Sequence, residues 1–245
     1  SNSIFKTMKM RWTFIKLLLA LTLTGVLFGF SQKRNNARNL TEVSVEFTDN
    51  NDPFITLTAV NKLLIQNNDT VTSIAKETLV LKEMEFRLLQ NPMVREAQVF
   101  VTIDGTLGAT IEQRNPIARV TGTVNFYIDE DGKKMPLSSV YSARVPLLTG
   151  YSESDFTELT SLLLQLRNDD FMNQVVTGIH QRKDGKLLFA LRKQNFKVMF
   201  GKPENIQKKF QNFKAFYQKA QKDTLLSAYR LVDLQFGSQV VATKR

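Results

Sequence analysis

The sequence predicts an α+β protein with an N-terminal transmembrane helix, a small β-α-α-β-β domain and a larger, mainly antiparallel β domain with flanking helices. Three observations support this prediction. Residues 12–30 are almost entirely apolar, residues 88–120 resemble a helix end followed by two alternating strands, and Asp-Gly pairs at 104–105, 131–132 and 184–185 indicate tight hairpin turns. The 245 residues are enough for two folded domains, each with a core.

The apolar segment 12–30 contains a single charge, Lys16, in 19 residues. A bilayer core of about 30 Å needs roughly 20 residues of helix, and a lysine near the helix end can extend to the interface. We therefore predict a tail at 1–11, a membrane span at 12–30 and a linker at 31–42. Lys16 and the free amino group favour a cytoplasmic N-terminus. The alternatives are a cleaved signal peptide, for which the cleavage pattern is poor, and a buried core helix.

The small domain is predicted over residues 43–119. Alternating apolar residues indicate a first strand at 43–47, and apolar residues at helical spacing indicate two helices, around 60–64 and 81–88. Asn91 and Pro92 end the second helix. A strand then alternates through Ala97, Val99, Val101 and Ile103, and Asp104-Gly105 turns it into a return strand.

The larger β domain is predicted over residues 120–245. Its first hairpin turns at residues 129–132. Apolar spacing then predicts helices and strands in the order helix 156–166, strand 175–180, strand 187–192, strand 196–200, helix 206–220, strand 229–236 and strand 239–243.

The formal net charge of +10 is concentrated in one segment. Residues 181–222 hold twelve Lys and Arg against Asp184 and Glu204, a local excess of +10. Such a segment attracts nucleic acid, anionic lipid or an acidic partner, or simply forms a solvated face. Its aromatic residues fall at core spacing, so we expect no nucleic-acid binding.

No residue pattern indicates catalysis, a cofactor or a metal. The absence of cysteine excludes disulfides, thiolate metal sites and a cysteine nucleophile. His180 is the only histidine, and no nucleophile motif accompanies it. Glu112 and Asp129 belong to no paired-carboxylate motif, and the acidic turn at 129–132 lacks the late glutamate of a calcium loop. We therefore expect a protein without enzymatic activity.

Three segments resemble the FtsQ/DivIB family of bacterial cell-division proteins: LLQNPMVREAQV (88–99), GTLGATIEQRNPIARV (105–120) and FYIDEDGKKMPLS (126–138). The segment VDLQF (232–236) is similar to the closing strand of that family. The positions that match the family pattern are Leu88, Pro92, Val94, Ala97, Val99, Leu107, Ile111, Pro116, Ile117, Ala118, Asp129 and Gly132.

The resemblance implies a single-pass protein of the bacterial inner membrane at the division septum, with a cytoplasmic N-terminus and a periplasmic bulk. Residues 43–119 would form a POTRA domain and residues 120–245 an FtsQ-type β domain. The family has no known enzymatic activity or cofactor. It links early and late division proteins as a divisome scaffold.

The resemblance also implies partner sites. Family members bind FtsB- and FtsL-like proteins by pairing a partner strand with their last strand. Here that edge would contain Gln235, Phe236, Gly237, Ser238, Gln239, Val240, Val241 and Ala242. Gln235 stands where the family often has arginine. A second surface, for other divisome components, would include Glu96, Val99 and Val101.

Two alternatives remain open at this point. A POTRA-type module of an outer-membrane protein assembly or secretion machine would carry repeated POTRA units or a barrel-forming tail, and the sequence shows neither. A cell-envelope enzyme, such as a wall hydrolase, would depend on Glu112 or Asp129.

Overall fold

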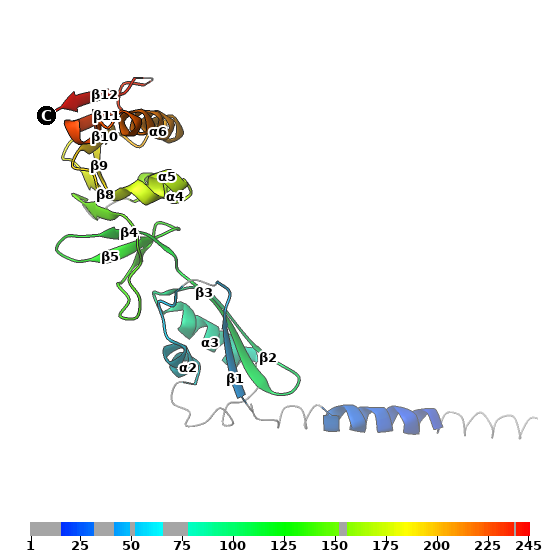
Figure 1. Ribbon diagram of the computed structural model, residues 1–245. Coiled ribbons are helices and arrows are strands. Elements are labelled where there is room, and N and C mark those ends of the chain that lie inside the picture. Colours follow the sequence, from blue (N-terminus) through cyan, green and yellow to red (C-terminus); the bar gives the residue numbers. More distant parts are fainter. Residues whose placement is uncertain (1–15, 32–41, 50–51, 66–77, 152–155, 238) are drawn as a thin grey trace, which may run out of the picture. The chain divides into compact units, whose positions relative to one another are not determined.

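The computed structural model describes residues 16–31, 42–49, 52–65, 78–151, 156–237 and 239–245 (Figure 1). The predicted tail 1–11, the first residues of the predicted span and most of the linker lie outside these ranges. Residues 16–31 form one helix whose side chains are exposed. Within the described ranges, no helix combines the length and the apolar character required to cross a bilayer.

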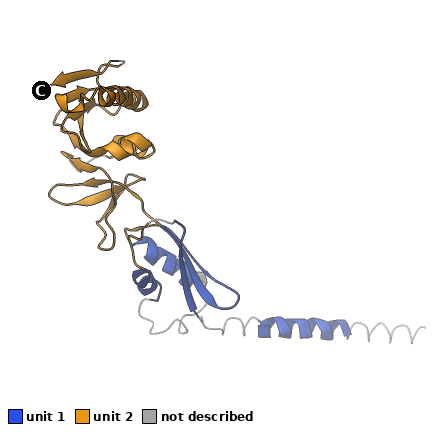
Figure 2. Cartoon of the chain, viewed as in Figure 1, with its two compact units in different colours: residues 1–49, 57–91, 96–112 blue, residues 50–56, 92–95, 113–245 orange. Residues whose placement is uncertain are grey.

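The described chain divides into two compact units, coloured separately in Figure 2. The first contains residues 1–49, 57–91 and 96–112, and the second contains 50–56, 92–95 and 113–245. The second unit therefore begins at residue 113 in the main part of the chain, whereas the predicted domain starts at 120. It also takes in two short segments from before that point.

The folded part of the first unit has the predicted β-α-α-β-β order. Its elements are β1 (Glu42–Phe47), α2 (Leu57–Ile65), α3 (Thr78–Leu89), β2 (Val94–Val101) and β3 (Thr106–Gln113). The strands form one sheet in the order β1-β3-β2, and β1 runs parallel to β3. The helices bury Val60, Leu64, Met84 and Leu88, and β3 buries Leu107 and Ile111.

The β2–β3 hairpin turns at Gly105, as predicted, with a φ of 99° that favours glycine. The prediction that the strand continues through Ile103 is wrong, because β2 ends before this residue and its side chain is 95% exposed. Strand β2 ends at Val101, and Thr102 closes the turn by accepting a hydrogen bond from the Gly105 amide. Gly108 lies under the Phe100 ring, where a Cβ atom would come within 2.3 Å of it.

The second unit contains one nine-stranded sheet in the order β12-β11-β10-β9-β8-β7-β4-β5-β6. Its first half consists of β4 (Pro116–Val120), β5 (Phe126–Asp129), β6 (Lys134–Met135), β7 (Leu147–Thr149), α4 (Thr157–Arg167) and α5 (Asp170–Val175). Its second half consists of β8 (Val176–Gln181), β9 (Leu187–Leu191), β10 (Lys197–Gly201), α6 (Ile206–Lys222), a 3₁₀ turn (Leu226–Ala228), β11 (Tyr229–Asp233) and β12 (Val241–Lys244).

The large sheet is mixed. Among the described residues, five pairs of neighbouring strands are antiparallel and three are parallel: β4–β7, β7–β8 and β10–β11. Helices α4 and α5 connect β7 to β8, and α6 connects β10 to β11, because parallel neighbours require a crossover. The predicted domain is thus mainly antiparallel only by a small majority of its strand pairs.

The core of this unit lies between the sheet and its helices. Figure 1 shows α4, α5 and α6 beside strands β8 to β12, and their buried side chains form one cluster with those of the strands. Phe189 and Phe200 stack at 4.7 Å between ring centroids, and Phe210 and Phe213 of α6 are fully buried. The prediction that the aromatic stripe of residues 206–220 faces the core is confirmed.

Candidate partner-binding strand at the sheet edge

Strand β12 forms one end of the nine-stranded sheet and, among the described residues, pairs on one side only, antiparallel to β11. Val232 faces Ala242 and Asp233 faces Val241 in the register. Ala242 is half-buried against the core, whereas Val241, Thr243 and Lys244 are exposed. The strand is therefore held by its ladder to β11 and by the Ala242 side chain, and it forms the outer edge of the sheet (Figure 1).

A turn separates β11 from β12 and explains where both strands stop. The Asp233 carboxylate accepts hydrogen bonds from the Gln235 amide (2.9 Å) and from the Gln235 side chain. Gly237 has a φ of 61°, and its carbonyl accepts a hydrogen bond from the Asn212 side chain of α6. These contacts hold the chain in a turn, so β11 cannot continue as a strand.

The structure corrects the extent of the predicted edge strand at 235–242, whereas partner binding by these residues stays a prediction. Only Val241 and Ala242 lie on the edge strand, which continues to Lys244. Gln235, Phe236, Gly237, Gln239 and Val240 belong to the turn, and Ser238 lies outside the described residues. Phe236 is 57% exposed, while Val240 packs partly against the core. The sequence pattern did not separate them from the strand because the turn depends on a side chain of β11 and on α6.

The second predicted surface lies on β2, which is an edge strand of the three-stranded sheet. Glu96 is exposed and Val101 is half-buried, but Val99 is only 7% exposed and belongs to the core. The Val99 amide donates a hydrogen bond to the Glu85 carboxylate of α3 at 2.8 Å. The Glu85 side chain of α3 is therefore already hydrogen-bonded to one main-chain amide of this edge strand.

The acidic turn at 129–132 is a structural ion-pair cluster. The Asp129 side chain is 1% exposed and accepts hydrogen bonds from Arg114 at 2.6 Å and from the amides of Asp131 and Lys133. Arg95 bridges Glu130 and Asp131 on the surface. Arg167 binds the other oxygen of Glu130 at 3.0 Å.

The two carboxylates considered for catalysis are not part of the same compact unit. Glu112 belongs to the first unit and Asp129 to the second. Across the described residues, no group of three or more His, Cys, Asp and Glu side chains is arranged to hold a metal ion. The ring of His180 lies 2.9 Å from the Thr149 hydroxyl, at the exposed face of β7 and β8.

Part of the basic segment serves the fold. Lys209 of α6 is 9% exposed, donates a hydrogen bond to the Lys202 carbonyl at 2.8 Å and lies over the Phe200 ring. Burial lowers the pKa of its ammonium group. Lys214 pairs with Asp169, the residue that caps α5. Other lysines of this segment, such as Lys208 and Lys219, lie on the exposed side of α6, where they contact solvent or can bind a partner.

Comparison with known proteins gives two similarities. A family model described as "FtsQ/DivIB, C-terminal related" matches residues 115–243, which is slightly more than half of the chain and contains nearly all of the large sheet. A protein named "Cell division protein FtsQ" from Geotalea daltonii is 24% identical over 179 residues. That similarity covers 68% of this chain and 64% of the relative, so the chain spans just under two thirds of the relative's length.

Proposed function

The chain belongs to the FtsQ/DivIB C-terminal related family, and from that premise we propose that it is a non-enzymatic, membrane-anchored scaffold of bacterial cell division. It would connect early and late division proteins at the septum by binding partners of the FtsB and FtsL kind. The single observation that carries this proposal is β12, an edge strand with one paired side at the end of the sheet matched by the family.

The proposed mechanism is strand addition. A partner strand would donate and accept main-chain hydrogen bonds along the outer edge of Val241–Lys244, and side chains beside the edge would set the specificity. Val241 is 45% exposed and Phe236 is 57% exposed, so both offer apolar surface beside the edge. We propose that Phe236 contacts the partner from the turn, and not from the strand itself.

Anchoring is proposed through residues 12–30. In the helical part of this segment the leucine, valine and phenylalanine side chains are more than half exposed, for example Leu18 at 68% and Phe28 at 69%. A helix with apolar side chains on all sides is stable in lipid and not in water. The N-terminus would remain cytoplasmic, and residues 43–245 would lie on the periplasmic side of the inner membrane.

Depletion in the native bacterium tests the role in division. We expect cells that elongate without septa, because a scaffold of the septum is lost. Cells of normal length that divide on schedule would contradict the proposal.

Co-purification tests the partners. After cross-linking in membranes and detergent extraction, the full chain should retain small membrane proteins with coiled-coil segments. Co-purification with an outer-membrane barrel protein would instead support a module of a protein-assembly or secretion machine.

A further inference from the structure

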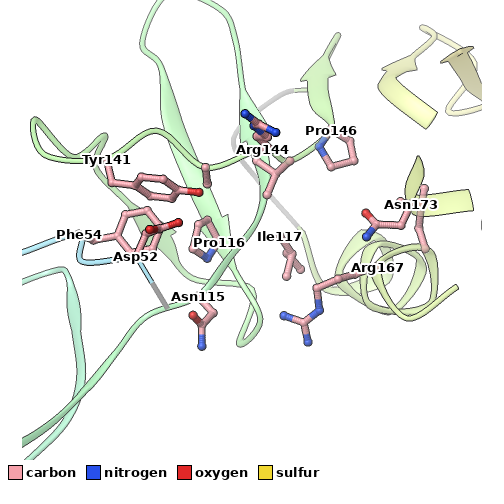
Figure 3. Close-up of a pocket in the computed structure, with 13 residues that line it drawn as sticks. Asp52, Phe54, Asn115, Pro116, Ile117, Tyr141, Arg144, Pro146, Arg167 and Asn173 are labelled. Carbon is pink, nitrogen blue, oxygen red and sulfur yellow. The ribbon is translucent and has the colours of Figure 1, made fainter. Parts of the chain in front are cut away.

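A cavity of about 260 Å³ in the second unit belongs to none of the surfaces described above (Figure 3). It lies where the parallel strands β4 and β7 begin and where α4 ends. Figure 3 shows Tyr141, Asp52 and Phe54 on one side, Arg167 and Asn173 on the other, and Pro116 and Ile117 between them. All these residues belong to the same compact unit.

The floor of the cavity is apolar and buried. Pro116 and Ile117 of β4, Pro146 and Leu166 are all buried. Pro146 is held beside β4, because the Arg119 amide donates a hydrogen bond to its carbonyl at 2.9 Å. Such a floor suits one apolar side chain, and the volume is below the roughly 300–1,000 Å³ of sites for drug-sized ligands and cofactors.

Most of the polar groups around the cavity already have partners. The Tyr141 hydroxyl donates a hydrogen bond to Asp52, and this interaction is the main cause that raises the pKa of Tyr141. Arg167 is paired with Glu130. Arg144, an exposed guanidinium at the rim, forms no ion pair with any residue in the described part of the chain.

One available guanidinium beside an apolar floor matches a single carboxylate attached to an apolar residue. A guanidinium forms short, two-pronged hydrogen bonds with a carboxylate. A phosphate or a polyanionic surface fits less well, because the second arginine is already neutralised and Asp52 would repel additional negative charge. The Asn173 side chain, also exposed at the rim, can bond to a peptide main chain.

We propose that this cavity binds a short peptide segment that carries a free carboxylate next to an apolar side chain. The carboxylate pairs with Arg144 and the apolar side chain occupies the floor at Ile117. The carboxylate can be the end of a chain or an acidic side chain, and the recognising chemistry is the same.

Fluorescence anisotropy with the full chain in detergent micelles tests this proposal. Three labelled hexapeptides with one central leucine are compared: one with a free C-terminal carboxylate, one amidated with a glutamate after the leucine, and one amidated and neutral. We expect at least one carboxylate peptide to bind about tenfold more tightly than the neutral peptide. The tighter of the two identifies the source of the carboxylate.

Two variants locate the site. Arg144→Ala should reduce the preference for carboxylate to below about twofold, whereas Arg182→Ala, at an exposed arginine of the β8–β9 turn, should leave it intact. Ala143→Leu, which narrows the cavity, should weaken all three peptides, with circular dichroism confirming an unchanged fold. Equal affinity for neutral and acidic peptides, absence of binding at millimolar concentration, or a preference retained in Arg144→Ala would overturn the proposal.

Discussion

Replacing Arg114 by alanine should destabilise the second unit strongly. Arg114 is 15% exposed and its partner Asp129 is 1% exposed, so the substitution leaves a carboxylate buried without its cation. Removing one member of a buried ion pair costs roughly 3–5 kcal/mol. Asp129 keeps hydrogen bonds from the Asp131 and Lys133 amides, so we expect the lower end, about 3 kcal/mol. That is a large share of a typical unfolding free energy of about 5–15 kcal/mol.

Urea denaturation followed by circular dichroism measures the loss, and hydrogen exchange at the Lys133 amide reports on the turn itself. Arg95→Ala is the matched control, because Arg95 pairs with Glu130 and Asp131 at the surface and its loss should cost at most about 1 kcal/mol. The double variant Arg114→Met with Asp129→Asn removes both charges and should recover most of the loss. A loss below about 1 kcal/mol in Arg114→Ala, or additive costs in the double variant, would refute this reasoning.

Three further predictions concern the edge strand, a buried hydroxyl and the core. Val241→Asp places a charge on the open edge and should weaken partner binding in a pull-down by about tenfold, whereas Val124→Asp, at a loop position 65% exposed, should have no effect; equal binding by both variants would move the interface elsewhere. The Tyr151 hydroxyl is buried, has no hydrogen-bond partner in the described part of the chain, and has a pKa raised by burial. Tyr151→Phe should therefore raise the unfolding free energy by about 1 kcal/mol. Because the folded pKa is raised, the unfolded chain loses this proton first, so the wild type should lose stability faster than the variant above the usual pKa of tyrosine, as urea titrations at alkaline pH would show. Phe213→Ala should cost about 3–5 kcal/mol in the same assay, since this ring is fully buried between Phe171 and Tyr217, and a smaller loss would indicate that the core closes around the cavity.

The features that depend on neighbouring residues could be predicted from the sequence. The Asp-Gly turns have glycines with φ of 99°, 74° and 77° at Gly105, Gly132 and Gly185, and the helices bury the residues whose spacing indicated them. These signals are local, because turn geometry and helical periodicity are set by a few consecutive residues.

The features that depend on distant residues were missed. Periodicity does not show that β10 and β11 run parallel across α6, or that Arg114 meets Asp129 fifteen positions later. The extent of the edge strand was missed for the same reason. Strand β11 ends where the Asp233 carboxylate and Asn212 of α6 hold the chain in a turn. The alternation of apolar residues had extended that strand to Phe236.

The two ends of the large sheet are unequal, and this bears on assembly size. Strand β12 has four residues, while β6 at the other end has only two, Lys134 and Met135. Filaments built by strand pairing need two compatible edges on every subunit, and a two-residue strand offers too few main-chain groups for a stable ladder. Copies of this chain would therefore not polymerise by pairing β12 of one copy with β6 of the next. Pairing through this sheet favours closed complexes of fixed stoichiometry over open polymers.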